Sequence, residues 1–347
     1  MRATTPHAAP TRTSAQRRRR SGAALALVAS AALVLAACSS GGSDGAATTT
    51  TTAMPRLPAG VHPFAEKKPG TAGEAIGTPS RWLGPQGTVG QFVVHCRFSH
   101  QGTNDPIVHP NMPGMSHLHQ FYGPPSTNAR STPEKLVRSK TTTCDKPADT
   151  AAYWQPALLD HGKEVQALDM SAYYRPAPGV AEKDVIPFPF GMAMLAGDQF
   201  ATTPQEGEAA GWTCGVQTTL HDDPPTCGVG DPLHLVLTFP DCWDGVWVDS
   251  EDHVSHVAYS DHGTCPKGFP KHVPQLTVSI RFPISGTGHD LSLASGNIYS
   301  AHGDFFNAWD PAGLEREVEH CINRGAVCDL ASNRQENPLF TYQPLVP

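Results

Sequence analysis

The heptapeptide Leu276-Thr277-Val278-Ser279-Ile280-Arg281-Phe282 alternates apolar and polar side chains at every position. Because successive side chains of an extended strand point to opposite faces, this alternation predicts a β-strand with one buried face. Four further β-rich runs lie between clusters of Pro and Gly, at residues 92–98, 233–239, 246–248 and 254–259. Such a series of short strands and turns predicts an antiparallel β-sandwich or barrel-like domain.

The composition of the 347-residue chain agrees with this fold class. Gly and Pro number 32 and 33, and together they make up about 19% of the chain against a usual ~12%. This excess argues against a helix bundle or a coiled coil, because both residues interrupt helices. No internal repeat or second linker separates the β-rich runs. The sequence therefore predicts a single mainly β domain with long loops over residues 81–347.

Two short helices are expected among the strands. Thr132 offers an N-terminal cap and Pro133 a first helical residue for a helix that ends near Lys140. The second helix is expected at about 311–323, after the cap Asp310. Its apolar residues recur at helical spacing and should face the core: Leu314, Val318, Cys321 and Ile322.

The first 37 residues have the features of a secretory signal peptide. Arg17 to Arg20 precede the apolar run 23–37, which is shorter than the ~20 apolar residues of a spanning helix. The ending Leu35-Ala36-Ala37-Cys38 is similar to the bacterial lipobox, whose cysteine is lipidated and becomes the first residue of the mature chain. We therefore expect an extracytoplasmic protein held at the cell membrane by a lipid on Cys38. An uncleaved short anchor is the alternative.

Residues 38–80 are rich in Gly, Ser, Thr, Ala and Pro, a composition that predicts a flexible linker between the anchor and the domain. Beyond the leader, 19 basic residues stand against 32 acidic ones, a net charge of −13. Nucleic acid is bound through clusters of Lys and Arg, so an acidic protein of this kind disfavours it as a partner. We expect a monomer that does not bind nucleic acid.

Eight cysteines follow Cys38, and an even number in an exported chain predicts four disulfides. Eight cysteines allow 105 pairings, and our working hypothesis joins them in the order of the sequence. The expected pairs are Cys96 with Cys144, Cys214 with Cys227, Cys242 with Cys265, and Cys321 with Cys328.

The segment His117-Leu118-His119 places two imidazoles on one side of an extended strand. Many β-rich metal sites present two ligands in this way and take a third from elsewhere. Met112 and Met115 add thioethers just upstream, and Met with His favours copper over zinc or calcium. The alternative is that the methionines fill a gap in the core and the histidines form hydrogen bonds within a loop.

The segment His302-Gly303-Asp304 repeats this spacing with one imidazole and one carboxylate. These two groups could ligate a metal, or act as a base and its orienting partner. Equally, Asp304 could only satisfy backbone donors in a turn.

Acidic and aromatic side chains gather between residues 241 and 256. Trp243 could stack on a sugar ring while two of the carboxylates in this segment serve as general acid and base. The alternative is a turn-rich acidic loop pinned by Cys242. The sequence has no G-x-S-x-G, H-E-x-x-H, Walker or G-x-G-x-x-G motif, so the serine hydrolase, zincin and nucleotide-binding classes lack their signals.

Four motifs in this order resemble the DUF1996 family, a domain of unknown function in secreted fungal and bacterial proteins. They are Asp105-Pro106-Ile107-Val108 followed by His117-Leu118-His119, then 194–198, then 239–245 with 252–259, and finally 302–310. The resemblance covers about residues 91–322 and implies no established activity. It places the following residues at motif positions: His117, His119, Cys242, Trp243, Asp244, Asp252, His256, His302, Asp304, Asn307 and Trp309.

His, Asp and Asn dominate these positions, whereas a purely structural motif would more often be apolar or Gly. We therefore predict one shared polar site, with copper or zinc as the candidate ion and His117 and His119 among its ligands. The predicted catalytic residues are His117, His119, His256, His302 and Asp304. The predicted ligand-binding residues are Trp243, Asp244, Asp252, Asn307 and Trp309.

Three functions are compatible with these features. The first is a cell-surface protein that binds or cleaves cell-wall or environmental polysaccharide. The second is a non-catalytic lipoprotein that captures copper or zinc. The third is a structural module of the cell envelope, in which the histidines only satisfy loops. Whether the protein is an enzyme stays open at this point.

Overall fold

The computed structural model describes residues 54–70, 75–78, 80, 89–205, 207 and 209–328. The predicted signal peptide, Cys38 and the first part of the predicted linker lie outside the described residues. None of the described helices has the length and apolar character that a membrane span requires.

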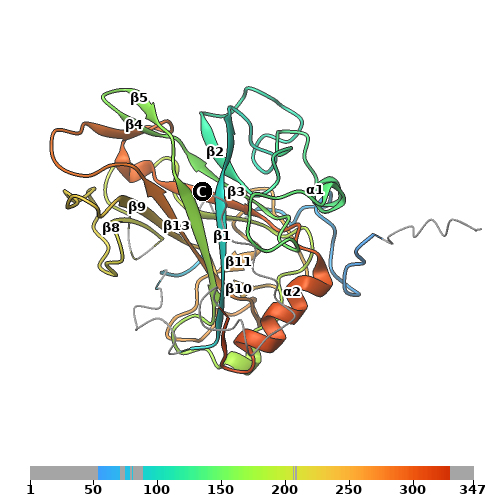
Figure 1. Ribbon diagram of the computed structural model, residues 1–347. Coiled ribbons are helices and arrows are strands. Elements are labelled where there is room, and N and C mark those ends of the chain that lie inside the picture. Colours follow the sequence, from blue (N-terminus) through green and yellow to red (C-terminus); the bar gives the residue numbers. More distant parts are fainter. Residues whose placement is uncertain are drawn as a thin grey trace, which may run out of the picture. The chain divides into compact units, whose positions relative to one another are not determined.

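A ten-stranded sheet forms the centre of the domain (Figure 1). Nine strands follow the path β7-β15-β3-β2-β1-β6-β13-β9-β8, and all neighbours along it are antiparallel. The nine are β1 (Gln91–Gly102), β2 (His119–Tyr122), β3 (Ala152–Pro156), β6 (Asp169–Arg175), β7 (Ala193–Gly197), β8 (Ala210–Cys214), β9 (Leu233–Thr238), β13 (Gln275–Phe282) and β15 (His302–Phe306). The tenth, β16 (Val327–Cys328), pairs with β1 in parallel.

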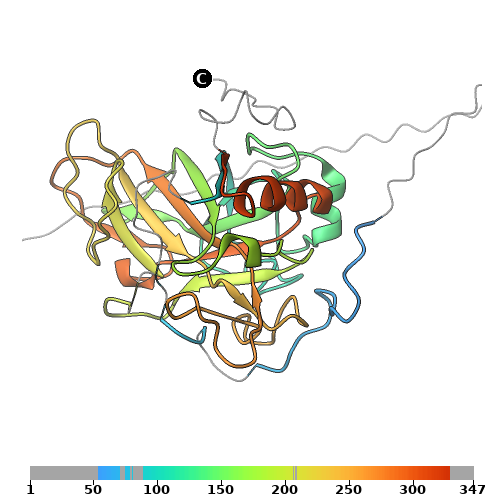
Figure 2. The same ribbon diagram turned by 90° about the horizontal axis from the view of Figure 1, so that it is seen from below.

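The sheet curves until β7, at one end of the path, lies beside β9 near the other end, and Figure 2 shows the strands from below. The predicted mainly β, antiparallel, barrel-like fold is therefore confirmed. Two small sheets flank the main one. They are β11-β10-β12 (Val257–Ala258, Cys242–Trp243, Lys271–His272) and β14-β4-β5 (Leu291–Leu293, Leu158–Asp160, Lys163–Val165).

The apolar side chains of the alternating runs fill the interior of the curved sheet. On β13 the four apolar residues of the heptapeptide are at most 3% exposed: Leu276, Val278, Ile280 and Phe282. Phe305 of β15 belongs to this interior, whereas the next residue, Phe306, packs in a second cluster with Phe121 and Trp154. Since successive side chains alternate between faces, this second cluster lies on the outer face of β2, β3 and β15. Ile107 and Leu136 cover that face, so it is also buried from solvent.

Both expected helices form. Helix α1 (Pro133–Ser139) starts after Thr132, whose hydroxyl accepts a hydrogen bond from the Lys135 amide. Helix α2 (Pro311–Glu317) starts after Asp310, which caps the Gly313 amide, and a π-helical turn (Val318–Ile322) continues it. Short 3-10 turns lie at Glu182–Asp184 and Ile298–Ser300. The apolar face predicted for the second helix is buried: Leu314, Val318, Cys321 and Ile322.

All four disulfides join the cysteines in sequence order, as predicted. They are Cys96–Cys144, Cys214–Cys227, Cys242–Cys265 and Cys321–Cys328.

Two of the predicted β-rich runs form little strand. The run 246–248 has none, and within 254–259 only Val257–Ala258 pairs as β11. The side chain of Asp244 explains the first case, because its Oδ1 accepts hydrogen bonds from the amides of Val246 and Trp247. A carboxylate that captures backbone donors in this way competes with a strand ladder.

Residues 54–70, here called the N-terminal strap, lie against the domain although they fall within the range predicted as linker. The His62 ring stacks on Trp247, with centroids 3.8 Å apart, and Phe64 packs on Phe306. Lys67 Nζ lies 2.5 Å from Asp249 Oδ2, and Lys68 Nζ lies 2.9 Å from Asp244 Oδ2. The described part of the predicted linker thus contributes apolar contacts and two ion pairs to the domain.

Candidate metal centre

Side chains alternate between the two faces of β15, and Phe305 points inward. His302 and Asp304 therefore lie on the outer face, together with Phe306. His119 begins β2 and has the same orientation as Phe121, which is on that face. Strand β3 separates β2 from β15, and its last residue, Pro156, pairs with His119.

The segment before β2 adds His117 to this face. The rings of His117 and His119 lie 4.2 Å apart, and those of His117 and His302 lie 5.0 Å apart. One nitrogen from each of the three imidazoles lies within 4.8 Å of the others. Three residues that the sequence predicted for one site, from segments far apart in the chain, are therefore brought together.

Hydrogen bonds to backbone carbonyls orient two of the three rings. Nδ1 of His119 lies 3.0 Å from the carbonyl oxygen of Asn104, and Nδ1 of His302 lies 2.8 Å from that of Ser300. A carbonyl only accepts, so both Nδ1 atoms carry the proton and both Nε2 atoms keep a lone pair. The Nε2 atoms of His117 and His119 are buried and have no hydrogen-bond partner among the described residues. Metal-binding histidines are typically held in this way, with one nitrogen tied to a carbonyl and the other free.

Two carboxylates complete the cluster. Ligand atoms of Asp105, His119 and Asp304 lie within 4.8 Å of one another. Asp105 is held by the amides of Ile107 and Val108, which both donate to its Oδ1. Neither oxygen of the buried Asp304 has a hydrogen-bond partner among the described residues. A buried carboxyl without partners is costly, and a proton or a cation relieves that cost.

Burial keeps the imidazoles of the cluster neutral. Burial and the neighbouring His117 lower the pKa of His119 to about 3, and burial and His119 lower the pKa of His302 to about 3. Burial also lowers the pKa of His117. Burial, and then the charge of Asp105, raise the pKa of Asp304 well above its ordinary value. At neutral pH the site thus offers three neutral imidazoles beside a carboxyl group whose burial opposes its ionisation.

The structure does not bring His256 to these residues. Its ring lies between Ser250 Oγ, 2.9 Å from Nδ1, and the carbonyl oxygen of Ala193, 2.7 Å from Nε2. Gly197 of β7 pairs with His302, and Ala193 is four residues away on the same strand. At ~3.3 Å per residue, His256 is about 13 Å from the centre along β7. Both of its nitrogens are occupied, so its role is to join the loop 250–256 to β7.

The predicted ligand-binding residues lie apart from the three imidazoles. The Trp243 ring is 4% exposed and its Nε1 donates to the carbonyl oxygen of Trp247, so the ring is not available to stack on a sugar. Asp244 pairs with Lys68 of the strap. Asp252 accepts from the Ser250 hydroxyl and the Ser255 amide, and it also borders the pocket described below.

Asn307 and Trp309 are likewise part of the core, each 1% exposed. The Asn307 side chain donates to the carbonyl oxygen of Pro189 at 2.9 Å and caps the Trp309 amide. Trp309 Nε1 donates to the hydroxyl of Tyr174. Both residues hold the end of β15 in place and have no exposed surface for a ligand.

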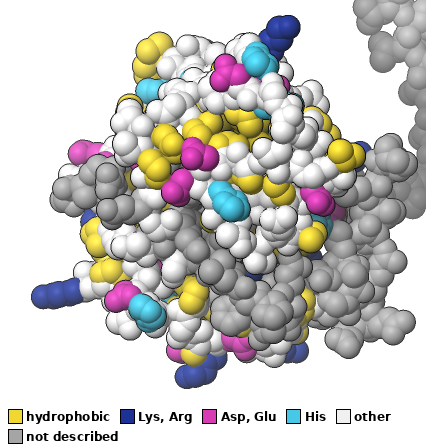
Figure 3. Space-filling model, turned by 90° about the vertical axis from the view of Figure 1, so that its left-hand side faces the viewer, with side chains coloured by type: hydrophobic (Ala, Val, Ile, Leu, Met, Phe, Trp, Pro, Cys, Tyr) yellow, Lys and Arg dark blue, Asp and Glu magenta, His cyan; other side chains and the backbone are white. Residues whose placement is uncertain are grey.

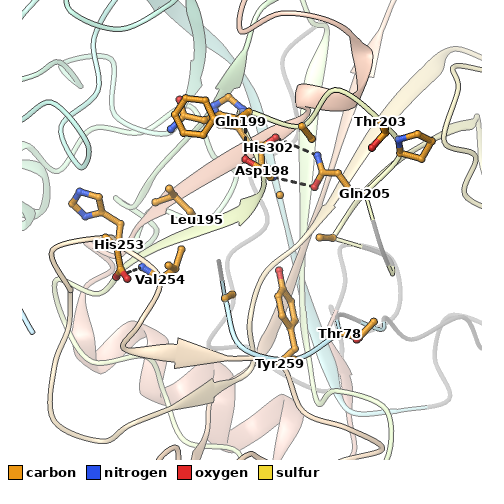
Figure 4. A pocket seen from close by; sticks show the side chains of 18 of the residues that line it. Thr78, Leu195, Asp198, Gln199, Thr203, Gln205, His253, Val254, Tyr259 and His302 are labelled. Atoms are coloured by element: carbon orange, nitrogen blue, oxygen red, sulfur yellow. Dashed lines mark hydrogen bonds between the residues drawn. The ribbon is translucent and has the colours of Figure 1, made fainter. Parts of the chain in front are cut away.

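A pocket of about 760 Å³ opens beside the centre, with His302 in its wall. Figure 4 shows His302, Asp198 and Gln205 on one side of it and Tyr259 and Thr78 on the other. Its size is typical of pockets for small ligands. The histidine cluster thus lies next to a space large enough for a small ligand.

Sequence reasoning did not select Asp105, or the loop 198–205 that carries Asp198, Phe200 and Gln205. Asp105 and Asp198 do lie in segments that resemble the family, at 105–108 and 194–198. That resemblance is the signal that could have marked them. Phe200 and Gln205 have no such signal, and their position follows only from the fold.

Fold and site together define a disulfide-linked, barrel-like β domain with a buried histidine cluster on its outer face. A family model described as a domain of unknown function (DUF1996) matches residues 105–309, more than half of the chain. The protein therefore belongs to the DUF1996 family, and the matched range contains all three imidazoles. No curated protein and no solved structure matches the chain.

Proposed function

We propose that this protein is an exported lipoprotein whose His117, His119 and His302 bind one divalent transition-metal ion, and that it acts on polysaccharide held in the adjoining pocket. One observation carries the proposal: a nitrogen from each imidazole lies within 4.8 Å of the others, and two of the rings are oriented by backbone carbonyls.

The donor set fits zinc or copper. Neutral imidazoles suit both ions, whereas magnesium and calcium prefer oxygen ligands. Three protein ligands with one open position are typical of catalytic zinc sites, where the ion supplies Lewis-acid chemistry. Asp304 fits as well, because a ligand oxygen of its side chain lies within 4.8 Å of a nitrogen of His119, and neither of its oxygens has a hydrogen-bond partner among the described residues. A cation there would offset the cost of its burial.

The pocket supports a polysaccharide as the molecule acted on. Its lining combines hydroxyl, amide and carboxylate groups with Phe200, whose ring is 79% exposed. Exposed aromatic rings beside polar groups suit sugars, which present apolar C–H faces and hydroxyls. The signal-like leader supports a location outside the cytoplasm, where polysaccharides of the cell wall or the environment are available.

Metal analysis of untagged protein tests the centre. We expect about one equivalent of zinc or copper in the wild type, and its loss in His119→Ala and His302→Ala. His262→Ala is the matched control, since the His262 side chain is 97% exposed and contacts only its neighbour Asp261. Saturation with metal at 100 times its Kd should stabilise the wild type by ~2.7 kcal/mol. Absence of metal from the wild type, with no stabilisation by added zinc or copper, would refute the proposal.

A second candidate function is capture of copper without catalysis. Met112 and Met115 are 45% and 58% exposed on the segment that leads into His117. Exposed thioethers are soft ligands that favour Cu(I). If this function holds, Met112→Leu with Met115→Leu should weaken Cu(I) binding and leave zinc binding unchanged. Cleavage of a glycan by the metal-loaded protein would favour the first function instead.

A further inference from the structure

The loop 198–205 forms the side of the pocket that adjoins the centre, and Gln205 fixes its position. The Gln205 amide donates to the carbonyl oxygens of Tyr299 and Ala301, at 2.6 and 2.7 Å, and its Oε1 accepts from the Asp198 amide at 3.0 Å. Ala301 directly precedes His302. The loop that exposes Phe200 is thus attached to the same backbone that positions a metal ligand.

The charge of the lining is entirely negative among the described residues. Asp198 and Asp252 line the pocket, and none of its described lining residues is Lys or Arg. Partial burial opposes ionisation of Asp252, but hydrogen bonds from Ser255, and then from Ser250 and Val254, outweigh it and lower its pKa below the ordinary value. Asp252 is therefore a fixed negative charge at the rim.

The two lysines of the strap that lie nearest to this part of the pocket are paired with other carboxylates. Lys67 lies 3.5 Å from Nδ1 of the lining residue His253, but its ammonium is already paired with Asp249 at 2.5 Å. Lys68 is paired with Asp244. Figure 3 shows Asp and Glu side chains, coloured magenta, and a His side chain near the middle of one face of the molecule. A carboxylate, sulfate or phosphate on a ligand would meet like charge here, and none of the described lining residues is a lysine or arginine that could pair with it.

Resting on the proposed function, we infer that the loop 198–205 is a sugar-binding element selective for uncharged glycans: Phe200 stacks on a sugar face and the carboxylates of Asp198 and Asp252 exclude polyanionic chains. Carboxylate oxygens accept hydrogen bonds from sugar hydroxyls, so the groups that repel an anion also hold a neutral glycan. Gln205 is a positioning residue, because it reaches the pocket only through the loop that it fixes.

Calorimetry with hexasaccharides of glucose and of glucuronic acid, in α and β linkage, tests this inference on the full chain. We expect a glucose hexamer to bind and its glucuronic acid counterpart to bind at least tenfold more weakly. Phe200→Ser should weaken glucose binding at least tenfold, while Phe200→Tyr keeps the ring and the affinity. Asp198→Asn keeps the oxygen that caps the Phe200 amide, and it should narrow the gap between the two hexamers.

Equal or tighter binding of the glucuronic acid hexamer overturns the inference, as does absence of binding by every hexamer or unchanged affinity in Phe200→Ser. Metal content measured on the same samples separates the two proposals. Sugar binding without metal refutes the metal centre and leaves the loop's role intact. Metal without sugar binding refutes this inference and leaves the centre intact.

Discussion

His119 on β2 and His302 on β15 meet across the intervening strand β3, with ring centroids 6.0 Å apart and ring planes at 80°. Two strand spacings amount to about 9.6 Å, so the two rings lean toward each other over Pro156. A backbone carbonyl holds each ring in this orientation: that of Asn104 for His119 and that of Ser300 for His302. The approach of the two rings therefore follows from the strand order and from the two carbonyls that hold them.

Replacing Asp304 should raise the stability of the metal-free protein and lower its affinity for metal. Asp304→Leu has a similar shape and removes two buried oxygens that lack partners among the described residues. We expect the metal-free variant to melt at a higher temperature, since an unsatisfied buried polar group costs ~1–3 kcal/mol. Metal affinity should fall by roughly 10–100-fold, as for other groups that support metal ligands. Calorimetry in chelator and in zinc measures both, and a less stable metal-free variant would contradict the assignment.

The strap should stabilise the domain through Lys67. The Asp249 side chain is completely buried, so Lys67→Met leaves it with His253 and the Ser250 amide as its partners. Breaking a buried pair costs ~3–5 kcal/mol, and with His253 still present we expect about 2 kcal/mol. Lys183→Met is the control, because Lys183 and Asp184 are both exposed and 3.6 Å apart. Urea unfolding measures both variants, and equal effects would show that the strap pair adds nothing.

Asp149 should make stability depend on pH. Its buried carboxyl accepts hydrogen bonds from Ala151 and Tyr153, and burial raises its pKa from 3.8 to about 8. The folded state therefore keeps a proton that the unfolded state releases, so this stability is present below pH 3.8 and is lost as the pH rises to 8.

Asp149→Asn has no such proton. Its free energy of unfolding relative to the wild type should increase between pH 4 and pH 8, by at most ~1.4 kcal/mol per pH unit. Urea unfolding at pH 5, 6.5 and 8 gives this difference, and a difference that is constant or falls with pH would contradict the assignment.

Loop length should rank the disulfides. Cys96–Cys144 closes 48 residues and Cys321–Cys328 closes 7. A disulfide stabilises a protein by restricting its unfolded chain, and more so for a longer loop. Changing both cysteines of a pair to Ala should therefore lower the free energy of unfolding by about 4 kcal/mol for the first pair and about 2.5 kcal/mol for the second. Urea unfolding of the two double variants checks the order, and a larger loss for Cys321 and Cys328 would reverse it.

Strands could be predicted from the sequence where apolar side chains recur in a regular pattern. The heptapeptide 276–282 and the run 92–98 form parts of β13 and β1 because each buries a regular set of side chains. The run 246–248 also consists of residues that favour strands, but Asp244 accepts hydrogen bonds from the amides of Val246 and Trp247. Propensity does not include that competition, so this strand was predicted and does not form.

The sequence allowed two pairs of site residues to be predicted, but not how the pairs come together. His117 and His119 are two residues apart, as are His302 and Asp304, and alternate side chains of a strand share a face. Each pair was therefore predicted to lie on one side of its strand. That β3 alone separates β2 from β15 depends on strand order, which alternation does not encode. For the same reason His256 was grouped with residues about 13 Å away. The indoles of Trp243 and Trp309 suit a sugar platform or a core equally well, and only the packing of the sheet decides between them.

The sequential disulfides also have a consequence for how the chain acquires them. The eight cysteines pair first with second, third with fourth, and so on along the chain, so no bridge encloses or crosses another. In a chain that emerges N-terminus first, every pair can close before the following pair becomes accessible. Oxidation in simple order of emergence then yields the native connectivity, without a step that breaks and reshuffles earlier bridges.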